Sequence, residues 1–133
     1  MKTTQTKLMG ILNITPDSFS DGGDYFDNPA QMIKRVRQML SEGVDIIDIG
    51  GESTRPGSEL VSEEVDLNRV IPVIKEIRKQ FGNNVTLSID TWKARVADEA
   101  LKAGVNMVNS IGGFMFDEKL ADPSQYQILL NDR

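Results

Sequence analysis

Short apolar runs alternate with amphipathic helical segments along the chain, and this alternation constrains the fold more than any other feature. Each helical segment carries an apolar stripe at helical spacing and is followed by a glycine, namely Gly43, Gly82 or Gly104. Because alternating strands and helices form a parallel sheet with right-handed crossovers, the sequence predicts an α/β fold. No G-x-G-x-x-G or Walker sequence follows the first run, which disfavours a doubly wound nucleotide-binding domain. The predicted strands span residues 8–12, 44–49, 85–89, 105–108 and 125–130.

Local signals mark the starts of the three predicted helices. Asn28 and Pro29 are typical of an N-cap and a first helical residue. Ser62 is followed by two glutamates and predicts the start of the second helix, and Thr91 can cap the third. Pro72 lies inside the second stripe, where we expect it to kink the helix.

The composition limits the chemistry that the chain can perform. Its 133 residues, of which 39% are hydrophobic, suffice for one ordinary domain. A net charge of −5 argues against a general nucleic-acid or anionic-membrane surface. The sequence shows no run that could span a bilayer and no signal-peptide core, so we expect a cytoplasmic protein. Because cysteine and histidine are both absent, catalysis would depend on carboxylates, amides, hydroxyls and cations.

Polar residues recur at the carboxyl ends of the predicted strands. Asn13, Asp90 and Asn109 each share a strand face with residues two positions earlier, and Asp48 fits the same pattern on the second strand. In a barrel these ends converge on the face where catalytic residues gather. A single Asn or Asp at a strand end often only shapes a loop. Four of them at matching depth favour a functional site.

The segment after the first strand offers carboxylates around an aromatic ring. Asp17 and Asp21 flank Phe19, and Asn13 precedes them. Such oxygen ligands suit Mg²⁺, which takes few protein ligands and completes its shell with water and phosphate oxygens. Phe19 could cover a flat organic ring. The alternative is a solvated turn with one buried aromatic residue.

The segment after the second strand suits an anion. Arg55 can bind a phosphate through two nitrogens, Thr54 adds a hydroxyl donor, and Pro56 stiffens the backbone. An exposed arginine is otherwise only solvated surface. Asp90 can accept hydrogen bonds from a heterocycle and stabilise positive charge on it, although it could instead cap the following helix.

Four motifs together resemble those of the dihydropteroate synthase family, the sulfonamide-sensitive enzymes of folate biosynthesis. The motifs are residues 10–23, residues 48–57, residues 88–91 and Asn109, and they extend over essentially the whole chain. The resemblance implies a (β/α)₈ barrel. It also implies condensation of 6-hydroxymethyl-7,8-dihydropterin diphosphate with 4-aminobenzoate, assisted by Mg²⁺, to give 7,8-dihydropteroate and diphosphate. The full-length family member is expected to be a homodimer.

The resemblance also implies roles for individual residues. Asn13 would lie at the metal and the diphosphate, together with Thr54 and Arg55. Asp90 and Asn109 would hold the pterin, with Asp90 as the electrostatic partner of a pterin-methyl cation. The other expected participants are the catalytic Asp21 and the substrate-binding Phe19, in a first loop that closes with Pro56 over the aminobenzoate.

Three departures from the family pattern concern residues and length. Ser110 replaces a common aspartate, and Leu130-Asn131 replaces a frequent Met-His pair. A complete barrel needs about 250 residues, so residues 1–133 would form only its first half, a single incomplete domain ending at the fifth strand. We therefore expect this chain to be a truncated piece of a synthase that is nearly inactive alone.

Two alternatives remain open on sequence grounds. A pterin- or folate-binding methyltransferase would use a related barrel for a different reaction. A non-catalytic half-barrel would instead assemble with a partner, since its two open sheet edges and its apolar face would otherwise meet water.

Overall fold

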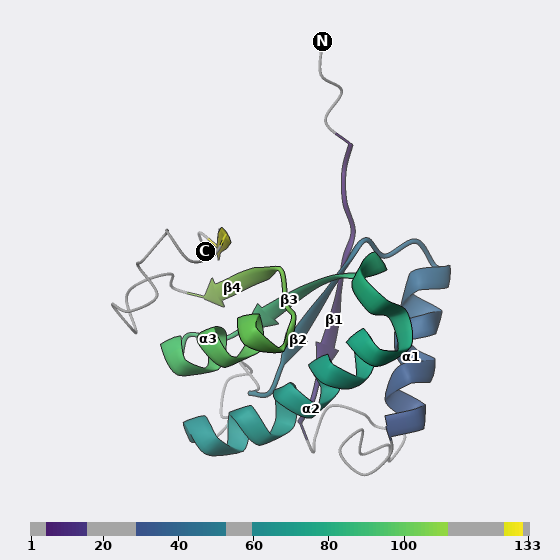
Figure 1. The fold of residues 1–133 in the computed structure, drawn as a ribbon. Helices are drawn as coiled ribbons and strands as arrows, with labels where there is room; N and C mark the ends of the chain where they lie inside the picture. Colours follow the sequence, from purple (N-terminus) through teal and green to yellow (C-terminus); the bar gives the residue numbers. More distant parts are fainter. Residues whose placement is uncertain (1–4, 16–28, 53–59, 112–126, 132–133) are drawn as a thin grey trace.

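The fold is described by a computed structural model for residues 5–15, 29–52, 60–111 and 127–131, with side chains up to residue 110. Within these ranges, one parallel sheet has the strand order β1-β2-β3-β4-β5, and three helices cover one of its faces (Figure 1). Each strand pairs with its neighbour in sequence, as in the first half of a (β/α)₈ barrel. The predicted α/β fold is confirmed. The elements are β1 (Met9–Asn13), α1 (Pro29–Ser41), β2 (Ile46–Gly50), α2 (Glu63–Phe81), the 3₁₀ turn η1 (Gly82–Asn84), β3 (Thr86–Asp90), α3 (Ala94–Ala103), β4 (Met107–Ile111) and β5 (Gln127–Asn131).

The glycines after α1 and α3 form helix caps, so the strands that follow begin later in the sequence than predicted. Gly43 and Gly104 have φ values of 94° and 123°, in the left-handed region where glycine carries no steric penalty. The next residues, Val44 and Val105, donate their amides back to carbonyls in the last turn of the preceding helix, at 3.1 Å in both cases. Both valines therefore complete a helix cap, and the predicted starts of β2 and β4 are two residues too early.

Of the predicted caps, Ser62 is confirmed, Thr91 is wrong, and Asn28 lies outside the described residues. Ser62 is the N-cap of α2, and its hydroxyl accepts a hydrogen bond from the Val65 amide at 3.3 Å. Thr91 does not cap α3, which begins three residues later at Ala94. Its hydroxyl accepts from the amide of Lys93 at 3.1 Å, because the chain forms a tight polar turn before the helix begins.

Both helical prolines lie where the sequence places them. Pro29 is the first residue of α1, a position whose amide has no partner within the helix. Pro72 lies inside α2, which remains one helix from Glu63 to Phe81. Pro72 therefore does not end the helix, although it cannot donate to the carbonyl one turn before it, and the expected kink stays a prediction.

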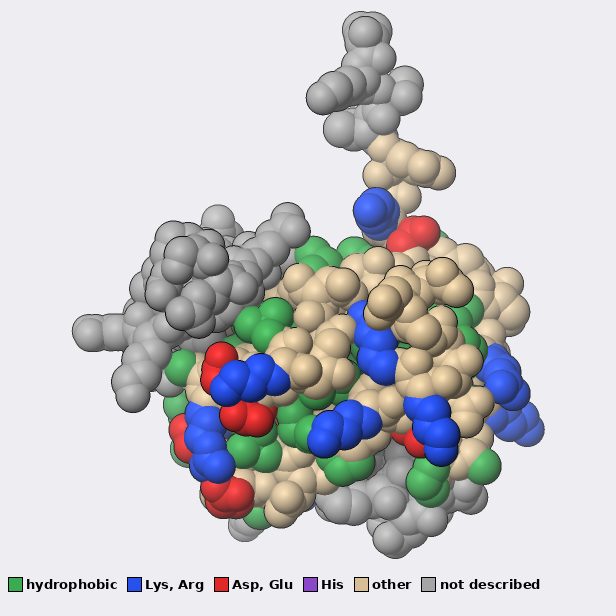
Figure 2. All heavy atoms as spheres, viewed as in Figure 1, with side chains coloured by type: hydrophobic (Ala, Val, Ile, Leu, Met, Phe, Trp, Pro, Cys, Tyr) green, Lys and Arg blue, Asp and Glu red, His purple; other side chains and the backbone are tan. Residues whose placement is uncertain are grey.

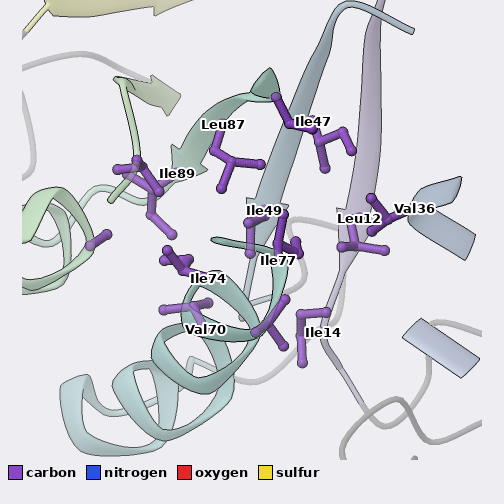
Figure 3. Packing of buried hydrophobic residues seen from close by; sticks show 14 of the residues in the cluster. Leu12, Ile14, Val36, Ile47, Ile49, Val70, Ile74, Ile77, Leu87 and Ile89 are labelled. Carbon is purple, nitrogen blue, oxygen red and sulfur yellow. The ribbon is translucent and has the colours of Figure 1, made fainter. Parts of the chain in front are cut away.

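The hydrophobic core lies between the sheet and the helices (Figure 3). Leu12, Ile49, Ile89 and Val108 are paired across four strands and are completely buried. They pack within one cluster that also contains residues of α2, and such burial contributes about 25 cal/mol per Å² of apolar surface. Because side chains alternate along a strand, the residues that follow each of these four point to the opposite face. The α2 residues labelled in Figure 3 are Val70, Ile74 and Ile77.

The helix-covered surface carries interspersed charges (Figure 2). Lys102 pairs with Asp98 at 2.9 Å and with Glu99 at 3.5 Å, while Arg95 pairs with Glu63 at 3.7 Å. Exposed pairs of this kind contribute little to stability, because water and salt screen their charges. In the described parts of the chain, every helix is too short or too polar to cross a membrane.

Candidate active site

Strand register brings three of the predicted polar residues to one level of the sheet. Asn13 pairs with Gly50, Gly50 with Asp90, and Asp90 with Asn109. Paired residues on parallel strands share a face, so Asn13, Asp90 and Asn109 all lie on the side away from the helices. Ser110, the departure from the family pattern, is buried on the opposite face.

Asp48 lies deeper than the sequence pattern predicts. It pairs with Ser88 and Ile11, two residues below the level of Asp90, so the expected equal depth of four polar residues is wrong for this one. The register of β2 places Gly50 at the upper level instead. Asn109 nevertheless reaches down to Asp48, and its Nδ2 donates to Asp48 Oδ2 at 3.0 Å.

Burial dominates the electrostatics of Asp48. Only 4% of the residue is exposed, and this burial raises the pKa of its carboxyl group, while the hydrogen bond from Asn109 opposes the rise. The Asn109 amide is thereby fixed in orientation by an acceptor beneath it. An amide that is already held in one rotamer loses less freedom when it contacts a planar ligand.

Asp90 has the most distinctive environment on this face. Burial, together with the negative charges of Asp48, Asp66 and Glu52, raises its pKa from 3.8 to about 7. Its carboxylate therefore binds protons near neutral pH, and a cationic or hydrogen-donating ligand would favour its ionised form. No capping contact joins it to α3 within the described residues, so the capping alternative for Asp90 is not supported.

Gly50 leaves an open space between two of these polar residues. A Cβ atom built at Gly50 would lie 3.4 Å from Asn13 Oδ1, 3.6 Å from Asp90 Cβ and 3.7 Å from Asp90 Oδ2. A side chain at this position would occupy the space that both polar groups border. The glycine thus keeps the centre of the strand-end face accessible.

A buried ionic cluster adjoins this face and was not predicted from the sequence. Lys93 Nζ donates to Glu52 Oε2 at 3.0 Å and to Asp66 Oδ2 at 3.1 Å, and only 4% of the lysine side chain is exposed. Trp92 Nε1 also donates to Glu52 Oε2, at 3.1 Å. The contacts join residues 27 to 41 positions apart, so local patterns could not reveal them. The one available signal was a glutamate and a lysine within a few residues of predicted strand ends.

Close packing of Gly51 supports this cluster. A Cβ atom at Gly51 would lie 2.3 Å from Asp66 Oδ1 and 2.9 Å from Val70 Cγ1. The backbone of the second strand therefore approaches α2 more closely than any side chain would allow. Arg69 secures this approach, since its Nη1 donates to the Gly51 carbonyl at 2.8 Å.

The described residues fit a magnesium ion that has few protein ligands. They contain no group of three or more His, Cys, Asp or Glu side chains that could hold a metal. Asn13 Oδ1 and Asp90 Oδ2 both border the space above Gly50, and such oxygens are the ligands that Mg²⁺ prefers. An ion here would need water or ligand oxygens to complete its shell.

Several predicted site residues lie outside the described part of the chain. They belong to the segments that follow β1 and β2, and their expected roles stay predictions. These residues are Asp17, Phe19, Asp21, Thr54, Arg55 and Pro56.

Comparison with known proteins identifies similar sequences along almost the whole chain. The model of the family described as pterin binding enzyme matches residues 9–128. A dihydropteroate synthase of Clostridium beijerinckii is 53% identical over 117 residues, which cover 88% of this chain and 42% of the relative. That of Bacillus subtilis is 55% identical over 117 residues and is covered to 40%. The chain thus spans less than half the length of these relatives.

Solved structures give the same result at the level of the fold. A dihydropteroate synthase from Clostridium difficile, crystallised with pteroic acid, superposes with a TM-score of 0.79 at 53% identity, covering 87% of this chain and 43% of that one. The Yersinia pestis enzyme in complex with a sulfonamide drug gives 0.80 at 44% identity, with 93% and 45% covered. The parallel sheet described above therefore corresponds to part of a TIM barrel.

Proposed function

The chain belongs to the family of pterin-binding enzymes, and from this premise we propose that it supplies the pterin-binding side of a dihydropteroate synthase. In this reaction the amine of 4-aminobenzoate forms a C–N bond with the methylene carbon of 6-hydroxymethyl-7,8-dihydropterin diphosphate. The C–O bond to diphosphate breaks, and the amine loses a proton. The products are 7,8-dihydropteroate and diphosphate. The relatives reported above are all dihydropteroate synthases, so the methyltransferase alternative is not favoured.

The alignment of Asn13, Asp90 and Asn109 around the side-chain-free Gly50 is the observation that carries this proposal. A pterin is flat and carries ring N–H and amino groups, so it needs an acceptor at its edge and room for its face. Asp90 supplies the acceptor, Asn109 supplies an oriented amide, and Gly50 leaves the room.

The charge on Asp90 suits a reaction that develops positive charge. In the family the C–O bond is thought to break early, leaving a pterin-methyl cation for the amine to attack. A partly buried carboxylate with a raised pKa is poorly solvated before the reaction and gains from a cation beside it. We therefore assign electrostatic stabilisation to Asp90 and hold Asp21 as a second catalytic candidate.

The remaining roles concern the diphosphate and the aminobenzoate. Thr54 and Arg55 would bind diphosphate, and Asn13 would hold Mg²⁺ beside it. When bound, the ion would neutralise charge on the departing diphosphate. Phe19 and Pro56 would contact the aminobenzoate. The homodimeric state expected of the family also belongs to this proposal.

The test uses the intact polypeptide that carries this sequence. We expect diphosphate release only when the pterin diphosphate and 4-aminobenzoate are both present, with formation of 7,8-dihydropteroate. Tight folate binding without use of 4-aminobenzoate would instead support the methyltransferase. The isolated 133-residue chain should show almost no turnover, since complete barrels draw catalytic residues from many strand ends. Turnover by this chain at the rate of an intact synthase would refute that expectation.

A further inference from the structure

The carboxylate of Glu52 joins three segments next to the strand-end site. Its Oε1 accepts from the amide of Val61, just before α2, at 3.1 Å. Its Oε2 accepts from Trp92 at 3.1 Å and from Lys93 at 3.0 Å. Only 11% of the Glu52 side chain is exposed, so these contacts are made largely out of water, where they are stronger.

Two of these donors lie in the turn that directly follows Asp90. Trp92 and Lys93 are two and three residues after Asp90. The Thr91 amide donates to the Asn109 carbonyl at 3.0 Å, which connects the turn to β4. Glu52 connects the same turn to the end of β2 and to the start of α2. Movement of its carboxylate would therefore shift the backbone that carries Asp90.

We propose that Glu52 is a positioning residue for this site: its carboxylate fixes the turn at residues 91–93 and thereby holds Asp90 in place for a pterin. The inference rests on the proposed function for the identity of the ligand. The contacts of Glu52 in the free protein do not depend on the proposed function. The negative charge of Glu52 also raises the pKa of Asp90, so ligand measurements belong well above that pKa.

Asp66 offers a matched control because it binds the same lysine. Its Oδ2 accepts from Lys93 at 3.1 Å, and its side chain is as deeply buried as that of the lysine. The Trp92 indole and the Val61 amide, by contrast, donate to Glu52. Glu52→Gln and Asp66→Asn are both isosteric and both remove one charge from the ion pair. We expect the two variants to lower the melting temperature by similar amounts. Only Glu52→Gln should loosen the turn at residues 91–93.

The first measurement needs no ligand and follows the indole N–H of Trp92 by NMR in the intact polypeptide. We expect hydrogen exchange at this group to be about tenfold faster in Glu52→Gln, since the indole hydrogen bond loses its charged acceptor and is weakened. In Asp66→Asn the exchange rate should stay within about twofold of the parent, because the hydrogen bond from the Trp92 indole to Glu52 is retained. Equal exchange rates in Glu52→Gln and the parent would overturn the inference.

The second measurement is calorimetric binding of 6-hydroxymethyl-7,8-dihydropterin at about pH 9, where Asp90 is ionised in every variant and the dihydropterin keeps its ring N–H. We expect the dissociation constant to rise about tenfold in Glu52→Gln and to change less than about twofold in Asp66→Asn. Equal weakening in both variants would show a general loss of stability and refute positioning by Glu52. A parent protein that binds no pterin would refute the proposed function, and the indole exchange alone would then decide whether Glu52 holds the turn.

Discussion

At the scale of single residues, Asp90 shows how the same surroundings have opposite effects on stability and on function. Its pKa is raised from 3.8 to about 7, mainly by burial and further by three nearby carboxylates. The folded protein therefore holds a proton on Asp90 that the unfolded chain releases near pH 4. Between these two pKa values the folded state binds more protons, so its free energy of unfolding falls as the pH rises. The ionised form is disfavoured in the free protein and is the form that the proposed reaction uses.

Replacing Asp90 by Asn separates these two effects. We expect the variant to have a higher melting temperature than the parent at pH 8 and little difference at pH 4, because only the ionised carboxylate is penalised. Turnover should fall by orders of magnitude at every pH. In the parent, kcat/KM should rise with pH through about 7 as Asp90 ionises. Differential scanning calorimetry and initial rates provide the measurements, and near-normal turnover would remove Asp90 from the mechanism.

At the scale of elements, adjacent glycines at the end of β2 perform different tasks. Gly51 permits contact with α2, where a Cβ atom would lie 2.3 Å from Asp66 Oδ1. Gly50 faces the proposed ligand space, where the nearest atom to such a Cβ would be 3.4 Å away. Gly51 therefore permits close packing against α2, and Gly50 keeps the proposed ligand space open.

Alanine at each position should have a distinct effect. Gly51→Ala should reduce the free energy of unfolding by about 1–3 kcal/mol or more, because Asp66 and Val70 must move. Gly50→Ala should change stability by less than about 1 kcal/mol and weaken pterin binding, because its methyl group lies in ordinary contact distance but fills the space. Urea denaturation and calorimetric binding test both. Equal stability losses would contradict the assignment of separate tasks.

Arg78 connects the end of α2 to two strands. Its guanidinium donates to the carbonyls of Gly82 and Gly104 at 2.8 Å and to that of Val85 at 2.7 Å. It also donates to Asn106 Oδ1 at 2.9 Å. The same Asn106 oxygen accepts from the Leu87 amide of β3. One side chain therefore holds the amino-terminal ends of β3 and β4 against the helix.

Replacing Arg78 by Met should lower the free energy of unfolding by about 2 kcal/mol or more, because several acceptors lose their donor together. The neighbouring exposed Lys79 provides the control, and Lys79→Met should change stability by less than about 0.5 kcal/mol. Urea denaturation of both variants measures the difference. Similar midpoints for the two variants would show that the Arg78 hydrogen bonds contribute little.

At the scale of the whole molecule, the helices cover one face of the sheet (Figure 1), and part of the opposite face is exposed at β1. On the face away from the helices, Met9 and Ile11 of β1 are 38% and 63% exposed, and Leu8 before them is 55% exposed. Among the described strands, β1 and β5 each pair on one side only. Apolar side chains beside an unpaired strand edge favour association with another chain.

The isolated 133-residue chain should therefore self-associate. Sedimentation velocity over a range of concentrations should show species larger than a monomer, and Ile11→Lys should shift them toward the monomer. Leu60→Lys makes the same change at a residue that is 83% exposed and lies outside the strands, so it should have little effect. A chain that stays monomeric at all concentrations would contradict the role assigned to the β1 edge.

Sequence alone determined the order of strands and helices, the starts at Pro29 and Ser62, and the polar residues at strand ends. These features depend on periodicity and on contacts within one turn, which can be recognised in a short stretch of sequence. Tertiary structure decided that Gly50 rather than Asp48 lies beside Asp90, and it created the buried cluster around Glu52. Register and ion pairing join residues up to 41 positions apart, and burial rather than residue type raises the pKa of Asp90. Such properties arise only when separate elements pack together.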